Sequence, residues 1–226
     1  MSDRHTNFQS NSFIEGIKEL SDRDRNLAEV IDRYGYPDRW SRKPGFATLT
    51  RIILEQQVSY ASAKATFKRL IDAVEDLTPE SFLTLDDEQL KAIGFSRQKT
   101  RYGRGLAQSI IDGTLDLPRL TTLDDAEIRK ELTKIKGIGD WTVDIYLMMA
   151  LQRQDVFASK DLAVAIATKE IKNLPARPTA SELESIARSW QPYRAIATKI
   201  LWHYYLNRKP SPNPRSRQTN NATVTN

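Results

Sequence analysis

The sequence predicts an all-α fold, on three observations. Apolar residues recur at helical spacing, most clearly in 46–58 (FATLTRIILEQQV). Helix start signals precede such runs, as at Thr78-Pro79, where a threonine cap is followed by proline at the first helical position. No segment combines strand alternation with hairpin turns at its ends. We therefore expect about ten helices, from the usual lengths of helices and loops.

Each expected helix is justified by an apolar run, a polar cap, or both. The runs, in chain order, are 27–31, 46–58, 61–74, 97–111 and 193–205. The predicted caps are Thr78, Ser96, Asp124, Asp161 and Thr179. Residues 1–12 and 209–226 are polar and poor in apolar side chains, so we expect two disordered tails around a helical core at 13–208.

Composition narrows the possible functions. The chain has 226 residues, of which 39% are hydrophobic and 28% are charged, as in an ordinary soluble protein. The absence of cysteine excludes disulfides, thiol catalysis, iron–sulfur clusters and Cys-based zinc sites. With two histidines, a multi-histidine metal centre is not expected, and the sequence predicts neither a cofactor nor a metal. The net charge of +5 permits nucleic-acid binding without requiring it.

A Gly-Ile-Gly turn and a later acidic residue carry the functional prediction. Gly137-Ile138-Gly139 stands between two apolar runs, where its backbone N–H groups can bind an anion of phosphate size at the start of a helix. A plain helix–turn–helix joint is the competing interpretation. Asp161 precedes the run LAVAIA and fits a helix N-cap, a place that stabilises a charged carboxylate. Both roles of Asp161 are compatible.

The string L-x-x-I-x-G-I-G-x-W-T…D-V-F-x-x-x-D, from Leu132 to Asp161, resembles the helix-hairpin-helix/Gly-Pro-Asp DNA glycosylase superfamily. The resemblance points to its 3-methyladenine DNA glycosylase II (alkylpurine) branch and spans about 27–206. It implies a two-lobed helical bundle with a cleft between the lobes and a helix-hairpin-helix at 124–150. It also implies that Asp161 is the catalytic residue.

Trp141 bears on the type of reaction. Superfamily members that also cut the strand carry a lysine two residues after the second glycine of the turn, and here that place holds Trp141. The resemblance therefore implies base removal without lyase activity. It also implies a base pocket that includes Trp141, Trp202, Ile145 and Leu162. An electron-poor alkylated purine would stack on the two indoles through cation–π attraction.

The resemblance also implies DNA contacts from three segments. The hairpin supplies Lys136, Gly137, Ile138 and Gly139. The stretch R-I-I-L-E-Q-Q-V-S resembles a minor-groove signature and supplies Gln56, Gln57 and Ser59, with Gln57 in the place of the wedge that fills the gap left by an everted nucleotide. The segment G-F-S-R-Q-K supplies Arg97 and Lys99, for which a solvated basic face is the alternative.

The sequence thus predicts a monofunctional glycosylase that excises alkylated purines such as 3-methyladenine and 7-methylguanine from double-stranded DNA. Two alternatives stay open: a glycosylase for deaminated or oxidised purines, and a non-catalytic helix-hairpin-helix DNA-binding protein. We expect a monomer. We expect no membrane partner, because no apolar stretch approaches membrane-spanning length. It would be cytoplasmic and nucleoid-associated in a bacterium, or nuclear in a eukaryote.

Overall fold

The computed structural model describes residues 3–209, with side chains described from residue 12 onward. Within that part of the chain there are thirteen α-helices and one 3-10 helix, and no strand. The predicted all-α class is therefore confirmed. None of the described helices is long and apolar enough to cross a membrane.

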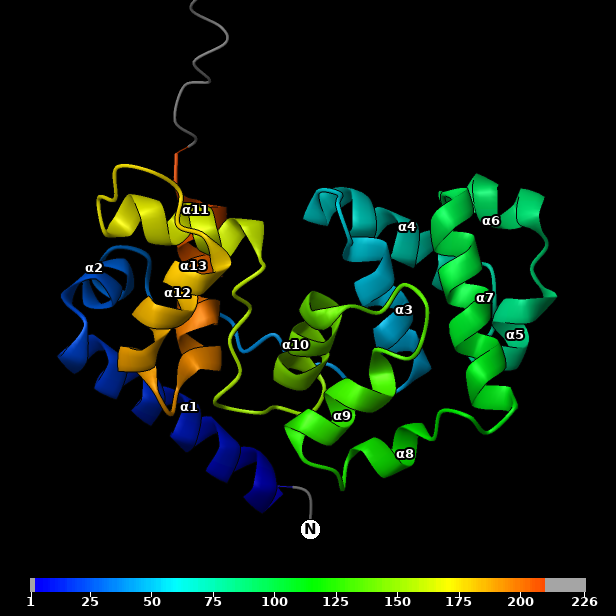
Figure 1. The fold of residues 1–226 in the computed structure, drawn as a ribbon, viewed down its shortest axis with the longest axis horizontal. Coiled ribbons are helices and arrows are strands. Elements are labelled where there is room, and N and C mark those ends of the chain that lie inside the picture. The colour runs from blue at the N-terminus through cyan, green and yellow to red at the C-terminus, as the bar shows by residue number, and fades with distance from the viewer. Residues whose placement is uncertain (1–2, 210–226) are drawn as a thin grey trace, which may run out of the picture.

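The helices form two lobes, each with its own hydrophobic core (Figure 1). Buried side chains of the first lobe, among them Leu49, Phe82 and Tyr146, form one continuous cluster. Its helices are α3 (Phe46–Glu55), α4 (Tyr60–Asp72), α5 (Pro79–Thr84), α6 (Asp87–Ile93), α7 (Arg97–Ile111), α8 (Leu117–Leu120), α9 (Asp125–Leu132) and α10 (Asp140–Met149).

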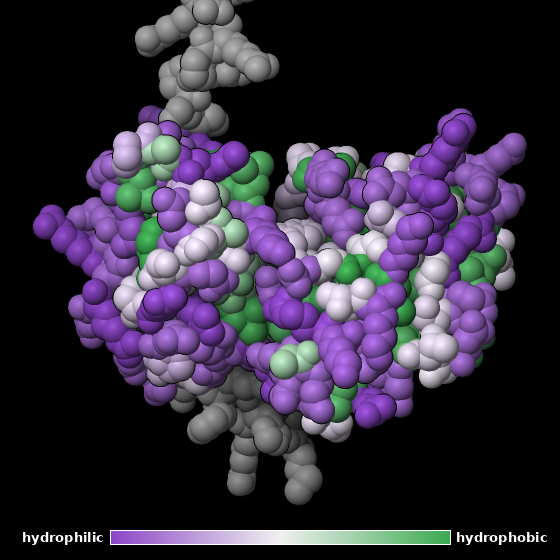
Figure 2. Space-filling model, viewed as in Figure 1, coloured by the Kyte–Doolittle hydropathy of each residue, from purple (hydrophilic) through white to green (hydrophobic). Residues whose placement is uncertain are grey.

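The second lobe joins both ends of the described chain. Buried Leu20, Leu27, Trp190 and Leu201 belong to its separate core. Its helices are α1 (Asp3–Arg23), α2 (Arg25–Tyr34), α11 (Leu162–Ile171), α12 (Ala180–Ala187), the 3-10 helix η1 (Arg188–Trp190) and α13 (Arg194–Asn207). Trp202 of α13 packs against both cores. In Figure 2 the surface is hollowed between the lobes, and its outer flanks are mostly hydrophilic.

All five predicted caps occupy the residue before a helix and accept a backbone N–H through their side chains. The expected disordered tail at 1–12 differs from the structure, because α1 begins at Asp3. Ile17 and Leu20 of α1 are buried, and extending an anchored helix costs much less than nucleating one. The predicted tail beyond residue 209 lies outside the described residues.

Candidate functional site

Asp161 lies where the two lobes meet. It caps α11: its Oδ1 accepts a hydrogen bond from the Val164 N–H at 3.0 Å. The residue is 9% exposed, so most of its surface is covered by protein. A capping carboxylate completes the first turn of a helix and is stabilised by the positive end of the helix dipole. The cap predicted at this position is therefore present, and it holds the carboxylate in a fixed place.

Two indoles hold the same carboxylate. Trp141 donates its Nε1–H to Oδ2 of Asp161 at 2.8 Å, and Trp202 donates its Nε1–H to Oδ1 at 3.2 Å. Trp141 comes from the first lobe and Trp202 from α13 of the second. Hydrogen bonds to a charged acceptor are stronger than neutral ones and fix its orientation. Sequence analysis predicted both tryptophans as pocket walls and missed their role as donors.

Hydrogen bonds leave the two oxygens of Asp161 unequal. Oδ1 receives two N–H groups and Oδ2 receives one. Among the described residues, no lysine, arginine or histidine forms an ion pair with Asp161, and the neighbouring Lys160 pairs instead with Asp140. Within the described part of the chain, the carboxylate of Asp161 is thus held by neutral donors and not by a cation.

The hairpin between α9 and α10 needs glycine at its first position. Gly137 has φ +96°, and a Cβ atom there would lie 2.2 Å from Cγ of Tyr102 on α7. Gly139 is the N-cap of α10 and has no side-chain cap, unlike Asp124, which forms a capping box at the start of α9. The first turn of α10 therefore presents backbone N–H groups that can donate hydrogen bonds to an anion.

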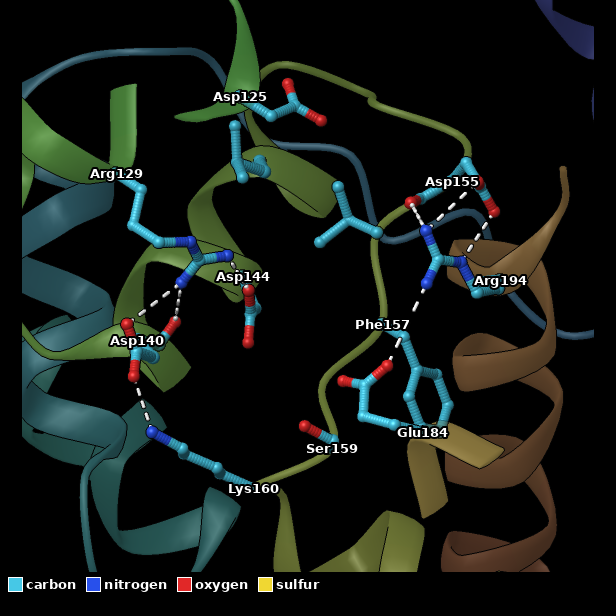
Figure 3. Close-up of a pocket in the computed structure, with 12 residues that line it drawn as sticks. Asp125, Arg129, Asp140, Asp144, Asp155, Phe157, Ser159, Lys160, Glu184 and Arg194 are labelled. Carbon is cyan, nitrogen blue, oxygen red and sulfur yellow. Dashed lines mark hydrogen bonds and ion pairs between the residues drawn. The ribbon is translucent and has the colours of Figure 1, made fainter. Parts of the chain in front are cut away.

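A second interaction crosses between the lobes beside the hydrogen bond of Trp141 to Asp161. Lys160 Nζ lies 2.5 Å from Oδ2 of Asp140, so residues 140 and 141 pair with residues 160 and 161. We call these two interactions the cross-lobe ladder. On α9, Arg129 lies 3.2 Å from Oδ1 of Asp140 and so holds the far side of that carboxylate (Figure 3).

A cavity of about 470 Å³ opens beside the ladder, lined by Asp140, Lys160, Glu184, Arg194 and neighbouring residues. Asp161 is not among the residues that line this cavity. Asp144 lies at its inner wall, 2.5 Å from Arg129. Burial raises the pKa of Asp144 to about 6, and the Arg129 guanidinium offsets only part of that effect.

The family model of the HhH-GPD superfamily of base excision DNA repair proteins matches residues 50–192, well over half of the chain. The chain belongs to the HhH-GPD superfamily. The matched region includes the hairpin and Asp161, so the HhH-GPD assignment rests on the segment that carries the candidate site.

Several HhH-GPD relatives carry names that point to DNA repair. YfjP of Bacillus subtilis is 30% identical over 162 residues, which cover 68% of this chain and 56% of YfjP. DNA-3-methyladenine glycosylase 1 of Schizosaccharomyces pombe is 29% identical over 182 residues, covering 79% of this chain and 80% of the relative. The chain thus spans little more than half the length of YfjP but most of the fission-yeast protein.

A solved HhH-GPD structure agrees with the sequence relatives. It is the S. pombe 3-methyladenine DNA glycosylase (Mag1) in complex with abasic DNA, which superposes with a TM-score of 0.77 at 30% identity. The match covers 83% of this chain and 95% of that chain. The similarity therefore extends over both lobes.

Three predicted site residues of this HhH-GPD chain have other roles in the structure. Gln56 donates from Nε2 to the Gly137 carbonyl and to Oγ1 of Thr142, both at 2.9 Å, so it holds the hairpin in place. Lys99 donates to the Leu54 carbonyl at 2.6 Å, and burial lowers the pKa of its ammonium. Ile145 is 2% exposed and belongs to the first core, because α10 is buried on nearly all sides.

The predicted DNA contact Ile138 is also 4% exposed in the first core, and its N–H donates to the Ile135 carbonyl at 3.0 Å. Five other predicted residues are exposed. Leu162, next to Asp161, is 56% exposed. Gln57 is exposed in a left-handed conformation with φ +56°, at the turn between α3 and α4. Ser59 is exposed and caps α4. Lys136 and Arg97 are exposed. Their DNA contacts stay predictions.

Sequence analysis missed Trp40. Its ring centroid lies 6.0 Å from that of Trp202 in an edge-on arrangement, and its φ of +44° is unusual for a bulky residue. Arg42, two residues later, forms a two-point ion pair with Glu55 and fixes this loop to α3. A single aromatic in a loop has no periodicity, so the sequence offers no signal for its place beside Trp202.

Proposed function

We propose that this chain is a DNA glycosylase that removes alkylated purines from double-stranded DNA and leaves the abasic strand uncut. The proposal rests above all on Asp161, a carboxylate that is nearly buried, oriented by three N–H donors and unpaired with any cation of the described chain. Such a group supplies fixed negative charge to a reaction that builds positive charge on a sugar. The names of the relatives, which are 3-methyladenine glycosylases, support the substrate class.

In the proposed mechanism the hairpin binds the DNA backbone. N–H groups around Gly139 donate hydrogen bonds to a phosphate oxygen, and the exposed Lys136 and Arg97 add positive charge. The damaged nucleotide leaves the stack at a cost of a few kcal/mol, by the general energetics of base flipping. Gln57, exposed at its turn, fills part of the gap.

The everted base enters beside the indoles of Trp141 and Trp202. An alkylated purine is cationic, so it is attracted to an aromatic face and is already a good leaving group. Oδ2 of Asp161, which receives one hydrogen bond, stabilises the oxocarbenium-like sugar and orients the attacking water. Cleavage of the N-glycosidic bond transfers the bonding electrons to the purine, and water adds to the anomeric carbon with loss of a proton.

The proposed lack of lyase activity rests on position 141. A tryptophan there cannot form a Schiff base, and its N–H is already bonded to Asp161. Lys160, the lysine next to Asp161, is paired with Asp140. An abasic duplex incubated with the protein should remain uncut, and borohydride should trap no covalent complex. Efficient nicking with a trapped complex would reject this part of the proposal.

Asp161→Asn tests the central step. Asparagine is as good an N-cap as aspartate, so α11 should stay folded while the negative charge is lost. Release of 3-methyladenine and 7-methylguanine should fall by at least about 100-fold, which corresponds to a loss of about 2.7 kcal/mol or more of transition-state stabilisation. Affinity for an abasic duplex should change little. Near wild-type turnover would remove Asp161 from the mechanism.

Asp24→Asn is the matched control. Asp24 also caps a helix, α2, and accepts an indole N–H, from Trp190 at 2.8 Å, but its charge is paired with Lys172. This variant should lose stability and keep its rate of base release per folded molecule. A panel of duplexes with deaminated and oxidised purines separates the alternative substrate class. DNA binding without release of any base would favour the non-catalytic alternative.

A further inference from the structure

The chain between α2 and α3 brings a tryptophan against one of the indoles that hold Asp161. Trp40, in this segment, is partly buried and packs against the first core. Its ring centroid lies 6.0 Å from that of Trp202, with 74° between the ring planes. In such a pair the positive edge of one ring meets the negative face of the other, so the contact fixes orientation as well as distance. The Trp202 indole therefore contacts both Trp40 and the carboxylate of Asp161.

The backbone at Trp40 is strained. Its φ is +44°, a left-handed conformation that a bulky residue rarely adopts. A conformation of this kind persists only where the surrounding structure imposes it, and it is most often found at functional sites. Glycine or asparagine would adopt it at lower cost. The strain therefore indicates that the indole of Trp40 contributes something at this place that compensates for it.

The segment after Trp40 is fixed to the first lobe. Arg42 forms a two-point ion pair with Glu55 of α3, and the two side chains are only 11% and 12% exposed. The Arg42 N–H also donates to the Met149 carbonyl at the end of α10, at 2.8 Å. Trp202, by contrast, belongs to α13 of the second lobe. The contact between the two indoles thus sets a ring held by the first lobe against a ring held by the second.

Trp202 makes the longest of the three hydrogen bonds that orient Asp161. Its bond is 3.2 Å long, against 2.8 Å for Trp141 and 3.0 Å for the Val164 N–H. The Val164 donor is part of a helix backbone, whereas an indole can rotate about its side-chain bonds. The direction of the Trp202 N–H therefore depends on what packs against its ring, and Trp40 does so.

We propose that Trp40 is a positioning residue for base excision, which holds the Trp202 indole in the orientation that donates to Asp161. This role rests on the proposed function, in which Asp161 is the catalytic residue and the everted base lies beside the indoles. A donor that is aimed at the carboxylate in advance needs no reorganisation during the reaction. Without Trp40 the Trp202 ring would adopt other rotamers, and Asp161 would lose a donor for part of the time. The loss should appear in the chemical step and not in DNA binding.

The first measurement does not depend on enzyme activity. The chain has four tryptophans, so the indole N–H region of a heteronuclear NMR spectrum of the full chain should contain four signals, and Trp202→Phe identifies that of Trp202. In Trp40→Leu the Trp202 signal should move toward the position of an indole without a carboxylate partner, and its proton should exchange faster with water. The signal of Trp190, which donates to Asp24, should not move.

The second measurement is the single-turnover release of 7-methylguanine from duplex DNA. Trp40→Leu should lower the rate about tenfold, by partial loss of one donor to the catalytic carboxylate. Affinity for an abasic duplex should be unchanged, because an abasic site places no base against the indoles. Trp40→Phe keeps an aromatic ring and should retain most of the rate. Phe82→Leu is the control: it removes a similar edge-on contact, to Phe46 in the first core, and should lower stability without changing the rate per folded molecule.

A folded Trp40→Leu variant with an unchanged Trp202 signal would overturn the proposal, as would a wild-type rate per folded molecule. A tenfold loss of affinity for the abasic duplex would assign Trp40 to DNA contact and reject the positioning role. If Trp40→Leu does not fold, Trp40→Met is judged by the same criteria. The proposed function fails by a different result, a wild type that releases no alkylated purine, and the Trp202 signal tests the contact with Trp40 in that case as well.

Discussion

Gly137→Ala should disrupt the hairpin that the proposed function assigns to DNA binding. The backbone at Gly137 has φ +96°, and the new Cβ would lie 2.2 Å from Cγ of Tyr102. Carbon atoms pack at about 3.5–4.0 Å, so the tyrosine ring or the hairpin must move by more than about 1 Å. Gln56, which donates to the Gly137 carbonyl, resists movement of the hairpin.

The cost can be worked from these two terms. A left-handed conformation costs a non-glycine residue roughly 1–2 kcal/mol. Overpacking against the ring adds about 1–3 kcal/mol. Gly137→Ala should therefore lower the free energy of unfolding by roughly 2–5 kcal/mol, with a large loss of affinity for an abasic duplex.

Urea unfolding and fluorescence anisotropy measure the two effects. Tyr102→Ala makes room for the methyl group, so the double variant should be more stable than the sum of the single changes by about 1–3 kcal/mol. Gly105→Ala is the control: it lies in α7 with no atom within 4 Å of its Cβ, and should be neutral or stabilising. Full stability of Gly137→Ala, or strict additivity with Tyr102→Ala, would refute the reasoning.

Three further variants probe the site. Gly139 has φ −107°, and a Cβ atom there would have no other atom within 4 Å, so Gly139→Ala should cost less than about 1 kcal/mol of stability. The new methyl group should nevertheless weaken binding to an abasic duplex about tenfold in fluorescence anisotropy. Unchanged affinity would contradict a phosphate bound close to this residue. The pKa of Asp144 is about 6 in the folded protein, against 3.8 for the unfolded chain. Its favourable contribution to the free energy of unfolding is therefore complete below about pH 3.8 and disappears as the pH rises through 6. In urea titrations across that window, the wild type should lose up to about 3 kcal/mol more stability than Asp144→Asn. Lys160→Gln removes a half-exposed ion pair with Asp140 that is worth less than about 1 kcal/mol of stability, but it should lower kcat with little change in KM. The charge exchange, Asp140→Lys combined with Lys160→Asp, should restore part of the lost kcat. An unaltered kcat in Lys160→Gln would exclude a positioning role for this ion pair.

Local features of this fold could be predicted from the sequence. The five caps, the hairpin and the helix at 97–111 depend on residues within a few positions of one another, and the structure has them where the sequence predicted them. Gln56 and Lys99 show where such reasoning ends. Both are polar residues on expected DNA-facing segments, but their partners, the Gly137 and Leu54 carbonyls, lie 81 and 45 residues away. Sequence spacing alone cannot identify such partners.

Asp24 and Asp161 show the same limit at the candidate catalytic residue itself. Each is an aspartate directly before a helix, each caps that helix, and each accepts an indole N–H. They differ in whether a lysine pairs with the carboxylate. Lys172, 148 residues away in the sequence, pairs with Asp24 and, with the indole and backbone donors, keeps the pKa of Asp24 low. Lys160, the neighbour of Asp161, pairs with Asp140 instead. A carboxylate already paired with an ammonium has little field left to stabilise a cationic sugar, so the position of one lysine separates a structural cap from a group able to act on substrate.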